Sequence, residues 1–156
     1  MERDQALKDR VIRFVGPRFF ENGFSRTTTE ELSRELGISK KTLYRLFESK
    51  EAIVREVVRR QLRLVEEELS AVFDDESRNF VERISSQLGI ATRIMNTLGK
   101  PFLTDLARYA PDVWDEIETV RRERVFSRLA GLIMRGKEEG AIKPEVDPAV
   151  VVTIIV

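Results

Sequence analysis

Apolar side chains recur every three or four residues along almost the whole chain, and this spacing is the strongest constraint on its fold. Near the N-terminus an apolar residue falls at every fourth position, at Leu7, Val11, Val15 and Phe19. Positions four apart share one face of a helix, so such a stripe is buried against a neighbouring element. The same spacing runs from Lys50 to Phe73 and through most of the C-terminal half. The sequence therefore predicts an all-α fold.

Glycine, proline and short polar runs divide this pattern into separate helices. We expect a first helix that ends at Asn22, followed by helices over residues 29–36, 40–47, 50–73, 78–98, 101–109 and 111–140, and a further helix start at Asp147-Pro148. Gly16-Pro17 lies inside the first helix, where proline weakens or kinks the backbone. At ~1.5 Å per residue the helix over 50–73 is ~36 Å long, enough to connect two parts of a protein.

Two residue types are missing, and their absence excludes several kinds of function. The 156 residues contain no cysteine and no histidine, which excludes disulfides, thiolate or histidine zinc sites and serine–histidine triads. No stretch approaches ~20 consecutive apolar residues, so no transmembrane helix is expected. The charged start, Met1-Glu2-Arg3-Asp4, does not resemble a secretory signal. We expect a cytoplasmic protein without a cofactor.

The net charge of zero conceals an uneven distribution. Residues 1–65 hold 15 Lys+Arg and 10 Asp+Glu, whereas residues 66–156 hold 12 and 17. A basic front half can face a polyanion while an acidic back half serves another purpose. The excess is modest and gives only weak support by itself.

Residues 23–51 carry the most informative pattern. Two short helices are joined by the tight turn Gly37-Ile38-Ser39, with Thr28 and Glu31 forming a capping box for the first helix and Ser39 capping the second. This arrangement is typical of a helix-turn-helix. The inward residues that would lock the pair onto the first helix at Val15 and Phe19 are Leu32, Leu36, Ile38, Leu43 and Phe47. The second helix begins with polar and basic groups, as a helix that reads the major groove requires.

The same stretch resembles the DNA-binding domain of TetR-type transcriptional regulators. The resemblance covers residues 8–60 closely and rests on Gly23-Phe24, Thr27-Thr28, the run from Ile38 to Phe47, and Ser49-Lys50-Glu51-Ala52-Ile53. It implies an N-terminal three-helix helix-turn-helix DNA-binding domain over residues 1–49. A long helix, residues 50–73, would join it to a helical ligand-binding and dimerisation domain within residues 50–156. Pro17 and Lys41 depart from the usual pattern of the family.

The resemblance also implies a role for individual residues. Thr28, Tyr44 and Lys50 match positions that contact phosphate, while Lys40, Lys41 and Thr42 fall where such proteins reach bases. Ser39 and Arg45 complete the predicted DNA-binding set. Each residue has a structural alternative: Thr28 and Ser39 serve as caps in any case, Tyr44 can pack its ring on the core, and Arg45 and Lys50 can be solvated surface charges.

The back half contains large apolar residues that could line a cavity for a small molecule. The predicted ligand-binding set is Phe80, Met95, Phe102, Tyr109, Trp114 and Phe126. Residues of this kind at helical spacing are also what any helical core needs. By family resemblance we expect a homodimeric, ligand-responsive repressor. It would bind a palindromic operator in double-stranded DNA and respond to an apolar or amphipathic effector.

Two other classes of function stay open at this point. A helical interaction protein would show no salt-sensitive binding to DNA. A metal-dependent enzyme could use the acidic cluster Asp112, Asp115, Glu116 and Glu118. However, most of this cluster lies in the first turns of a helix that Pro111 opens, where negative charge is favoured by the helix dipole.

The last seven residues, from Val150 to Val156, are uncharged and all β-branched. An exposed segment of this kind is an aggregation hazard. We expect either that a partner surface covers it or that the natural chain continues beyond Val156.

Overall fold

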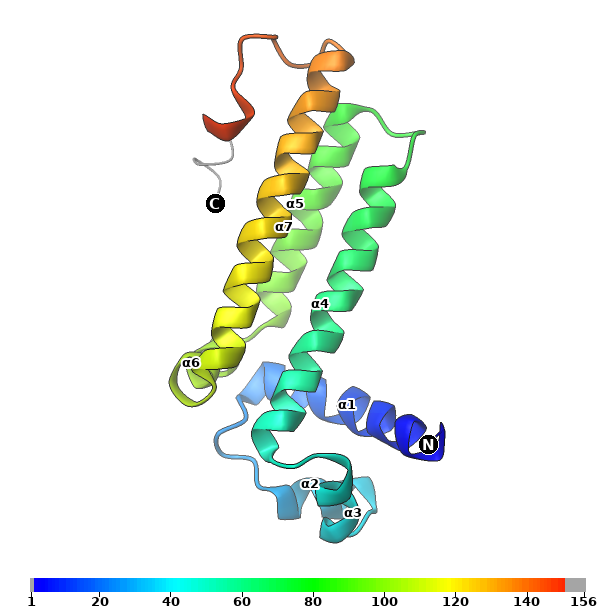
Figure 1. Cartoon of the computed structure of the whole chain (residues 1–156), viewed down its shortest axis with the longest axis vertical. Helices are drawn as coiled ribbons and strands as arrows, with labels where there is room; N and C mark the ends of the chain where they lie inside the picture. Colours follow the sequence, from blue (N-terminus) through cyan, green and yellow to red (C-terminus); the bar gives the residue numbers. More distant parts are fainter. Residues whose placement is uncertain (1, 151–156) are drawn as a thin grey trace. The chain divides into compact units, whose positions relative to one another are not determined.

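The computed structural model describes residues 2–150, apart from the side chains of Arg121, Val125 and Phe126. Over these residues the chain is all-α, as predicted, and contains no strand (Figure 1). The helices are α1 (Glu2–Asn22), α2 (Thr29–Leu36), α3 (Lys40–Leu46), α4 (Lys50–Asp74), α5 (Phe80–Thr97), α6 (Lys100–Tyr109) and α7 (Pro111–Glu138). None of the described helices combines the length and apolar character that crossing a bilayer needs. The C-terminal run lies outside the described residues from position 151 onward.

The predicted helix caps around the turn are confirmed. Thr28 Oγ1 accepts the backbone N–H of Glu31 at 3.2 Å, and Glu31 Oε2 accepts the backbone N–H of Thr28 at 2.9 Å. Gly37 ends α2 in the left-handed region with φ 67°, where a residue without Cβ is favoured. Ser39 Oγ accepts the N–H of Thr42 at 3.0 Å and opens α3. These local bonds fix where both short helices begin.

Six expected helix bounds differ from the structure by one or two residues: positions 47, 73, 78, 98, 101 and 140 are replaced by Leu46, Asp74, Phe80, Thr97, Lys100 and Glu138. The helix expected from residue 78 begins at Phe80 because Asn79 and Glu82 form a capping box. Asn79 Oδ1 accepts the N–H of Glu82 at 3.0 Å, and Glu82 Oε2 accepts the N–H of Asn79 at 2.9 Å. Phe47 is not the last residue of α3 but its C-cap, with an extended backbone. Pro17 lies within α1, and the helix continues on both sides of it.

The chain divides into two compact units. Unit 1 comprises Met1–Arg63 and Met95–Trp114, so it contains α1, α2, α3, the first half of α4 and all of α6. Unit 2 comprises Leu64–Ile94 and Asp115–Val156. The predicted domain boundary at residues 49 and 50 stays a prediction, since a compact unit is not the same as an independently folding domain.

Unit 1 has a dense apolar core around α1. Val11, Val15 and Phe19 are fully buried, as the spacing of four predicts. The helix-turn-helix packs onto them through Leu32, Leu36, Leu43 and Phe47, all buried, whereas Ile38 is only partly buried. The start of α4 closes the core with Ile53, Val54, Val57 and Val58. A Cβ at Gly16 would lie 3.6 Å from Val57, so α1 and α4 pass close to each other there.

Helix α6 also belongs to this core, which the sequence pattern did not predict. The ring of Phe102 is buried, with its centroid 5.0 Å from that of Phe20 and 6.0 Å from that of Phe24 in edge-to-face arrangements. The N–H of Gly99 donates to the carbonyl of Phe20 at 2.9 Å. Helix α6 is therefore bonded to the end of α1, directly before the helix-turn-helix.

In unit 2 three helical segments run side by side: the C-terminal part of α4, most of α5 and most of α7 (Figure 1). Ion pairs connect them: Glu68 of α4 with Arg93 of α5, and Glu66 of α4 with Arg128 of α7. The guanidinium of Arg83 is buried and pairs with Glu139 at 2.7 Å. Polar contacts thus contribute a large part of the packing in this unit.

Candidate nucleic-acid interface

Helix α3 has one buried face and one polar face. Leu43 and Leu46 anchor it in the core, whereas Lys40, Lys41, Tyr44 and Arg45 are exposed and Thr42 is partly exposed. An α-helix fits the major groove of B-DNA, where donors and acceptors on base edges can be read. The predicted recognition residues of this helix therefore share an accessible surface.

Tyr44 connects this surface to the start of α2. Its side chain is 45% exposed, and its hydroxyl lies 3.2 Å from the Oγ1 of Thr29. Lys40 Nζ lies 5.8 Å from the centroid of the Tyr44 ring, within the range of a cation–π contact. The ring of Tyr44 is thus accessible on the polar face of α3, and its hydroxyl lies next to the first residue of α2.

Thr28 uses its side-chain oxygen for the capping box, as described above. A hydroxyl that accepts one hydrogen bond still has a proton to donate. The cap and the predicted phosphate contact are therefore chemically compatible. The N–H of Thr28, together with the Thr28 side chain, holds the pKa of Glu31 below its ordinary value of 4.5.

Two of the cations on α3 are paired with carboxylates. Lys40 forms an ion pair with Glu30 of α2, which raises the pKa of Lys40 and lowers that of Glu30. Arg45 donates to Asp4 of α1 at 2.7 Å, and this hydrogen bond lowers the pKa of Asp4. Lys41 forms no such pair with any residue in the described part of the chain. Lys41 is therefore the cation on this face most available to an outside anion.

Lys50 differs from the other predicted contacts because its ammonium binds the protein itself. Its Nζ lies within hydrogen-bond distance of the carbonyl oxygens of Phe24, Ser25 and Thr27. The three acceptors belong to the loop between α1 and α2.

Arg26 was missed by the sequence analysis. It is exposed on the loop between Ser25 and Thr27 and makes no contact within residues 2–150 that would neutralise it. Its place two residues before the cap Thr28 is a signal that could have identified it. A basic side chain there can add to phosphate binding near the N-terminus of α2.

The predicted ligand-binding residues fall in both units. In unit 1, Phe102 is buried in the core, Met95 and Tyr109 are largely exposed, and Trp114 is partly exposed. In unit 2, Phe80 packs against Gly136, and the side chain of Phe126 lies outside the described residues. The ligand-binding assignment stays a prediction.

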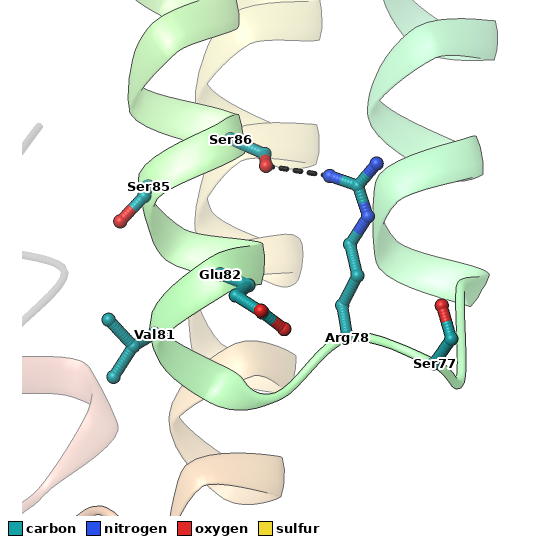
Figure 2. A pocket seen from close by; sticks show the side chains of 6 residues that line it. All are labelled: Ser77, Arg78, Val81, Glu82, Ser85 and Ser86. Atoms are coloured by element: carbon teal, nitrogen blue, oxygen red, sulfur yellow. Dashed lines mark hydrogen bonds between the residues drawn. The ribbon is translucent and has the colours of Figure 1, made fainter.

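An open recess of about 460 Å³ lies beside the start of α5 in unit 2 (Figure 2). It is lined by five polar residues and one apolar residue, Ser77, Arg78, Val81, Glu82, Ser85 and Ser86. Arg78 reaches across it to donate to Ser86 Oγ at 2.7 Å (Figure 2). No predicted ligand-binding residue lines this recess.

The acidic cluster at the start of α7 has a partner of its own. Asp112 pairs with Arg55 of α4, and this hydrogen bond lowers the pKa of Asp112. Among the described residues no group of three or more acidic side chains is placed to hold a metal ion.

Comparison with known families agrees with this geometry. Residues 18–57, which span the end of α1 through the start of α4, match the model of the bacterial regulatory proteins of the tetR family. This segment is similar to the helix-turn-helix of TetR-type regulators. It is also 27% identical over 123 residues to the HTH-type transcriptional regulator YvaF of Bacillus subtilis (strain 168), covering 79% of this chain. The chain spans 64% of the length of that relative.

Solved structures of the TetR family share the fold. One member of the TetR/AcrR family superposes with a TM-score of 0.79 at 22% identity, over 97% of this chain and 82% of the other. The regulator PfmR of Thermus thermophilus gives 0.71 at 23% identity, over 94% and 80%. The ketosteroid regulator KstR2 of Mycobacterium tuberculosis gives 0.68 at 22% identity, over 95% and 76%. These relatives are named as transcriptional regulators and not as enzymes.

Proposed function

We propose that this protein is a sequence-specific, DNA-binding transcriptional regulator. The observation that carries the proposal is the exposed polar face of α3, on which Lys40, Lys41 and Tyr44 lie together beside the N-terminus of α2. The family match over residues 18–57 supports the same conclusion. A regulator of this kind acts where the chromosome lies, so the proposal includes a cytoplasmic location.

In this mechanism, phosphate contacts fix the register of the protein on the duplex and base contacts select the sequence. We assign the phosphate contacts to Thr28 and Tyr44, whose hydroxyl groups are accessible at the start of α2 and on α3. Lys41 and Thr42 would reach base edges, together with Lys40 and Arg45 once these exchange their carboxylate partners for DNA. Ser39 caps α3 and sets the direction in which these residues project.

A single module of this size would bind DNA weakly. A two-fold homodimer would place two copies of α3 in successive major grooves ~34 Å apart, matching a palindromic operator. Binding to such a site would repress transcription if the site overlaps a promoter.

We further propose a small apolar or amphipathic effector. Two solved relatives support this class by name: KstR2 is called a ketosteroid regulator, and FadR of Bacillus halodurans a fatty acid degradation regulator, with a TM-score of 0.73 at 16% identity. The candidate contacts remain Phe80, Met95, Phe102, Tyr109, Trp114 and Phe126. An effector can shift operator affinity only by its differential affinity for two states of the protein.

The deciding experiment is an electrophoretic mobility shift with DNA that flanks the protein's own gene, at two salt concentrations. We expect a complex that weakens steeply with salt, as phosphate binding requires. Absence of any salt-sensitive complex, also with duplexes selected from a random pool, would favour a helical interaction protein instead.

A pair of variants shows whether α3 is the reading element. Lys41→Ala should relax preference at one base position by ~1–3 kcal/mol, the value of a good bidentate contact. Lys143→Ala removes the same charge from an exposed position in unit 2 and should change nothing. Equal effects of both substitutions would contradict the assignment of α3.

A further inference from the structure

The loop between α1 and α2 is held from two sides by groups of opposite charge. From α4, Lys50 Nζ donates to the carbonyl oxygens of Phe24 at 3.1 Å and of Ser25 and Thr27 at 3.2 Å. From α6, Asp105 Oδ2 accepts the backbone N–H groups of Phe24 and Ser25, both at 2.7 Å. The cation thus binds the carbonyl groups of the loop and the anion binds its N–H groups.

The surrounding residues are shaped for this arrangement. Gly23 has φ 78°, and a Cβ at this position would lie 2.5 Å from Asp105 Oδ2, so a larger residue would displace the carboxylate. The Phe24 ring is buried against Phe19 and Phe102, and Lys50 Nζ lies 5.9 Å from its centroid. The loop is therefore anchored by its side chain as well as by its backbone.

The loop leads directly into the proposed DNA-binding surface. Thr27, whose carbonyl binds Lys50, is buried and precedes the N-cap Thr28. A shift of this loop would move the start of α2, including Thr29, which lies beside the hydroxyl of Tyr44.

An ammonium group has three N–H donors, and here three carbonyl oxygens are available to accept them. Lys50 could bind a phosphate through Nζ only by giving up one of these bonds. This geometry does not fit the phosphate contact that the family resemblance implies for Lys50.

We propose that Lys50 and Asp105 form one clamp on residues 24–27 and act as positioning residues for DNA binding. Lys50 contributes through the loop rather than by touching phosphate, and Asp105 makes α6 part of the DNA-binding machinery. The inference rests on the proposed function, and its test includes one measurement that needs no DNA.

The DNA-free test is backbone amide exchange at Phe24 and Ser25. In the wild-type chain both N–H groups should exchange slowly, and Asp105→Ala should speed their exchange by about tenfold or more, as expected when a charge-assisted hydrogen bond is removed. Asp105→Asn keeps a side-chain oxygen acceptor and should restore part of the protection. Asp112→Asn, a control on α7, should leave both amides unchanged. Equal exchange rates in the wild type and in Asp105→Ala would overturn the clamp.

The DNA test uses duplexes that the wild-type chain selects from a random-sequence pool. Lys50→Met and Asp105→Ala should each weaken binding by about tenfold, and the double variant by little more, because both act through one loop. Independent contributions would multiply to about a hundredfold and would overturn the proposal.

The salt dependence separates the two roles of Lys50. If Lys50 only positions the loop, Lys50→Met should change the slope of log K against log salt no more than the charge-matched control Lys100→Met. Loss of a phosphate contact would make this negative slope shallower by ~0.9 relative to that control, and this result would contradict the positioning role. If the wild type selects no duplex at all, the proposed function fails, while amide exchange still decides whether the clamp exists.

Discussion

The two units of this protein are stabilised in different ways. Unit 1 contains most of the buried apolar side chains among the described residues, including five phenylalanines, Phe19, Phe20, Phe24, Phe47 and Phe102. In unit 2 the buried apolar side chains are Val72, Ile90, Leu132 and Ile133, for the residues whose burial is described. Unit 2 also buries Arg83 and Gln87, and Gln87 Nε2 has no hydrogen-bond partner in the described structure.

This difference matches what each unit has to do. A helix that reads base edges must be held in one geometry, and a close-packed core provides that rigidity. Unit 2 relies instead on polar contacts between helices, with Glu66, Glu68 and Glu139 as acceptors. The pair of Glu68 with Arg93 is exposed and contributes little stability, and fewer apolar side chains are buried in unit 2, so we expect unit 2 to open more readily than unit 1.

The largest effect should come from the core of unit 1. Phe102→Ala removes a buried ring from contact with Phe20 and Phe24 and should cost ~3–5 kcal/mol in the free energy of unfolding. Urea denaturation followed by circular dichroism measures this change. Met95→Ala, at a position 66% exposed, should fall within about 0.5 kcal/mol of the wild type. A small effect of Phe102→Ala would mean that α6 is not part of this core.

The next effect should come from the buried polar contacts of unit 2. Arg83→Met removes the hydrogen bonds of Arg83 to Glu139 and to the carbonyl of Asp75, and should cost ~1–3 kcal/mol. Arg78→Met breaks a more exposed pair with Asp75 and should cost only ~0–1 kcal/mol. Equal losses in urea denaturation would contradict the view that burial makes Arg83 important.

A smaller effect should follow from removing the cap of α2. Thr28→Ala removes the hydroxyl that accepts the N–H of Glu31 and should cost ~1 kcal/mol of stability. Operator affinity should fall as well, because this hydroxyl is the proposed phosphate contact. Thr104→Ala, at an exposed position on α6, is the matched control and should change neither quantity.

The smallest effect should be on the stability of the protein in acid, where the carboxylate of Glu31 becomes protonated. The pKa of Glu31 lies below 4.5 in the folded protein, so its ionised form adds stability that is fully present above about pH 4.5. This contribution is lost as the pH falls through the lowered pKa. Glu31→Gln keeps the side-chain acceptor of the capping box but cannot titrate. The thermal midpoint of Glu31→Gln should therefore decline less below pH 4.5 than that of the wild type. An unchanged acid profile, matching that of the exposed Glu76→Gln control, would contradict this role.

Features that depend on residues close together in the sequence were predictable. The capping box at Thr28, the left-handed Gly37 and the cap Ser39 follow from residues three or four apart, so the sequence was enough to predict them. The polar face of α3 follows from helix geometry in the same way. Asn79 shows the limit of this reasoning, because its capping box has the expected spacing and was still overlooked.

Contacts between distant residues could not be predicted in this way. Asp105 lies 80 residues from Ser25 and is the single acidic residue of a short helix, with nothing in its surroundings to mark it. The role of Lys50 was equally hidden, since a spacing pattern cannot show which backbone groups an ammonium will reach. Lys40 and Glu30 are ten residues apart and on different helices, so no helical spacing rule pairs them.

The place of α6 in unit 1 has a consequence for exchanging recognition modules between regulators. A transplant cut after Ser49 or Arg63 would take the helix-turn-helix but leave behind the ring of Phe102 and the carboxylate of Asp105. The host would then have to supply an aromatic ring for Phe20 and Phe24 to pack against, and a carboxylate at the position of Asp105. A helix-turn-helix grafted onto a host without an equivalent of this pair should lose operator binding, even when every base-contacting residue is retained.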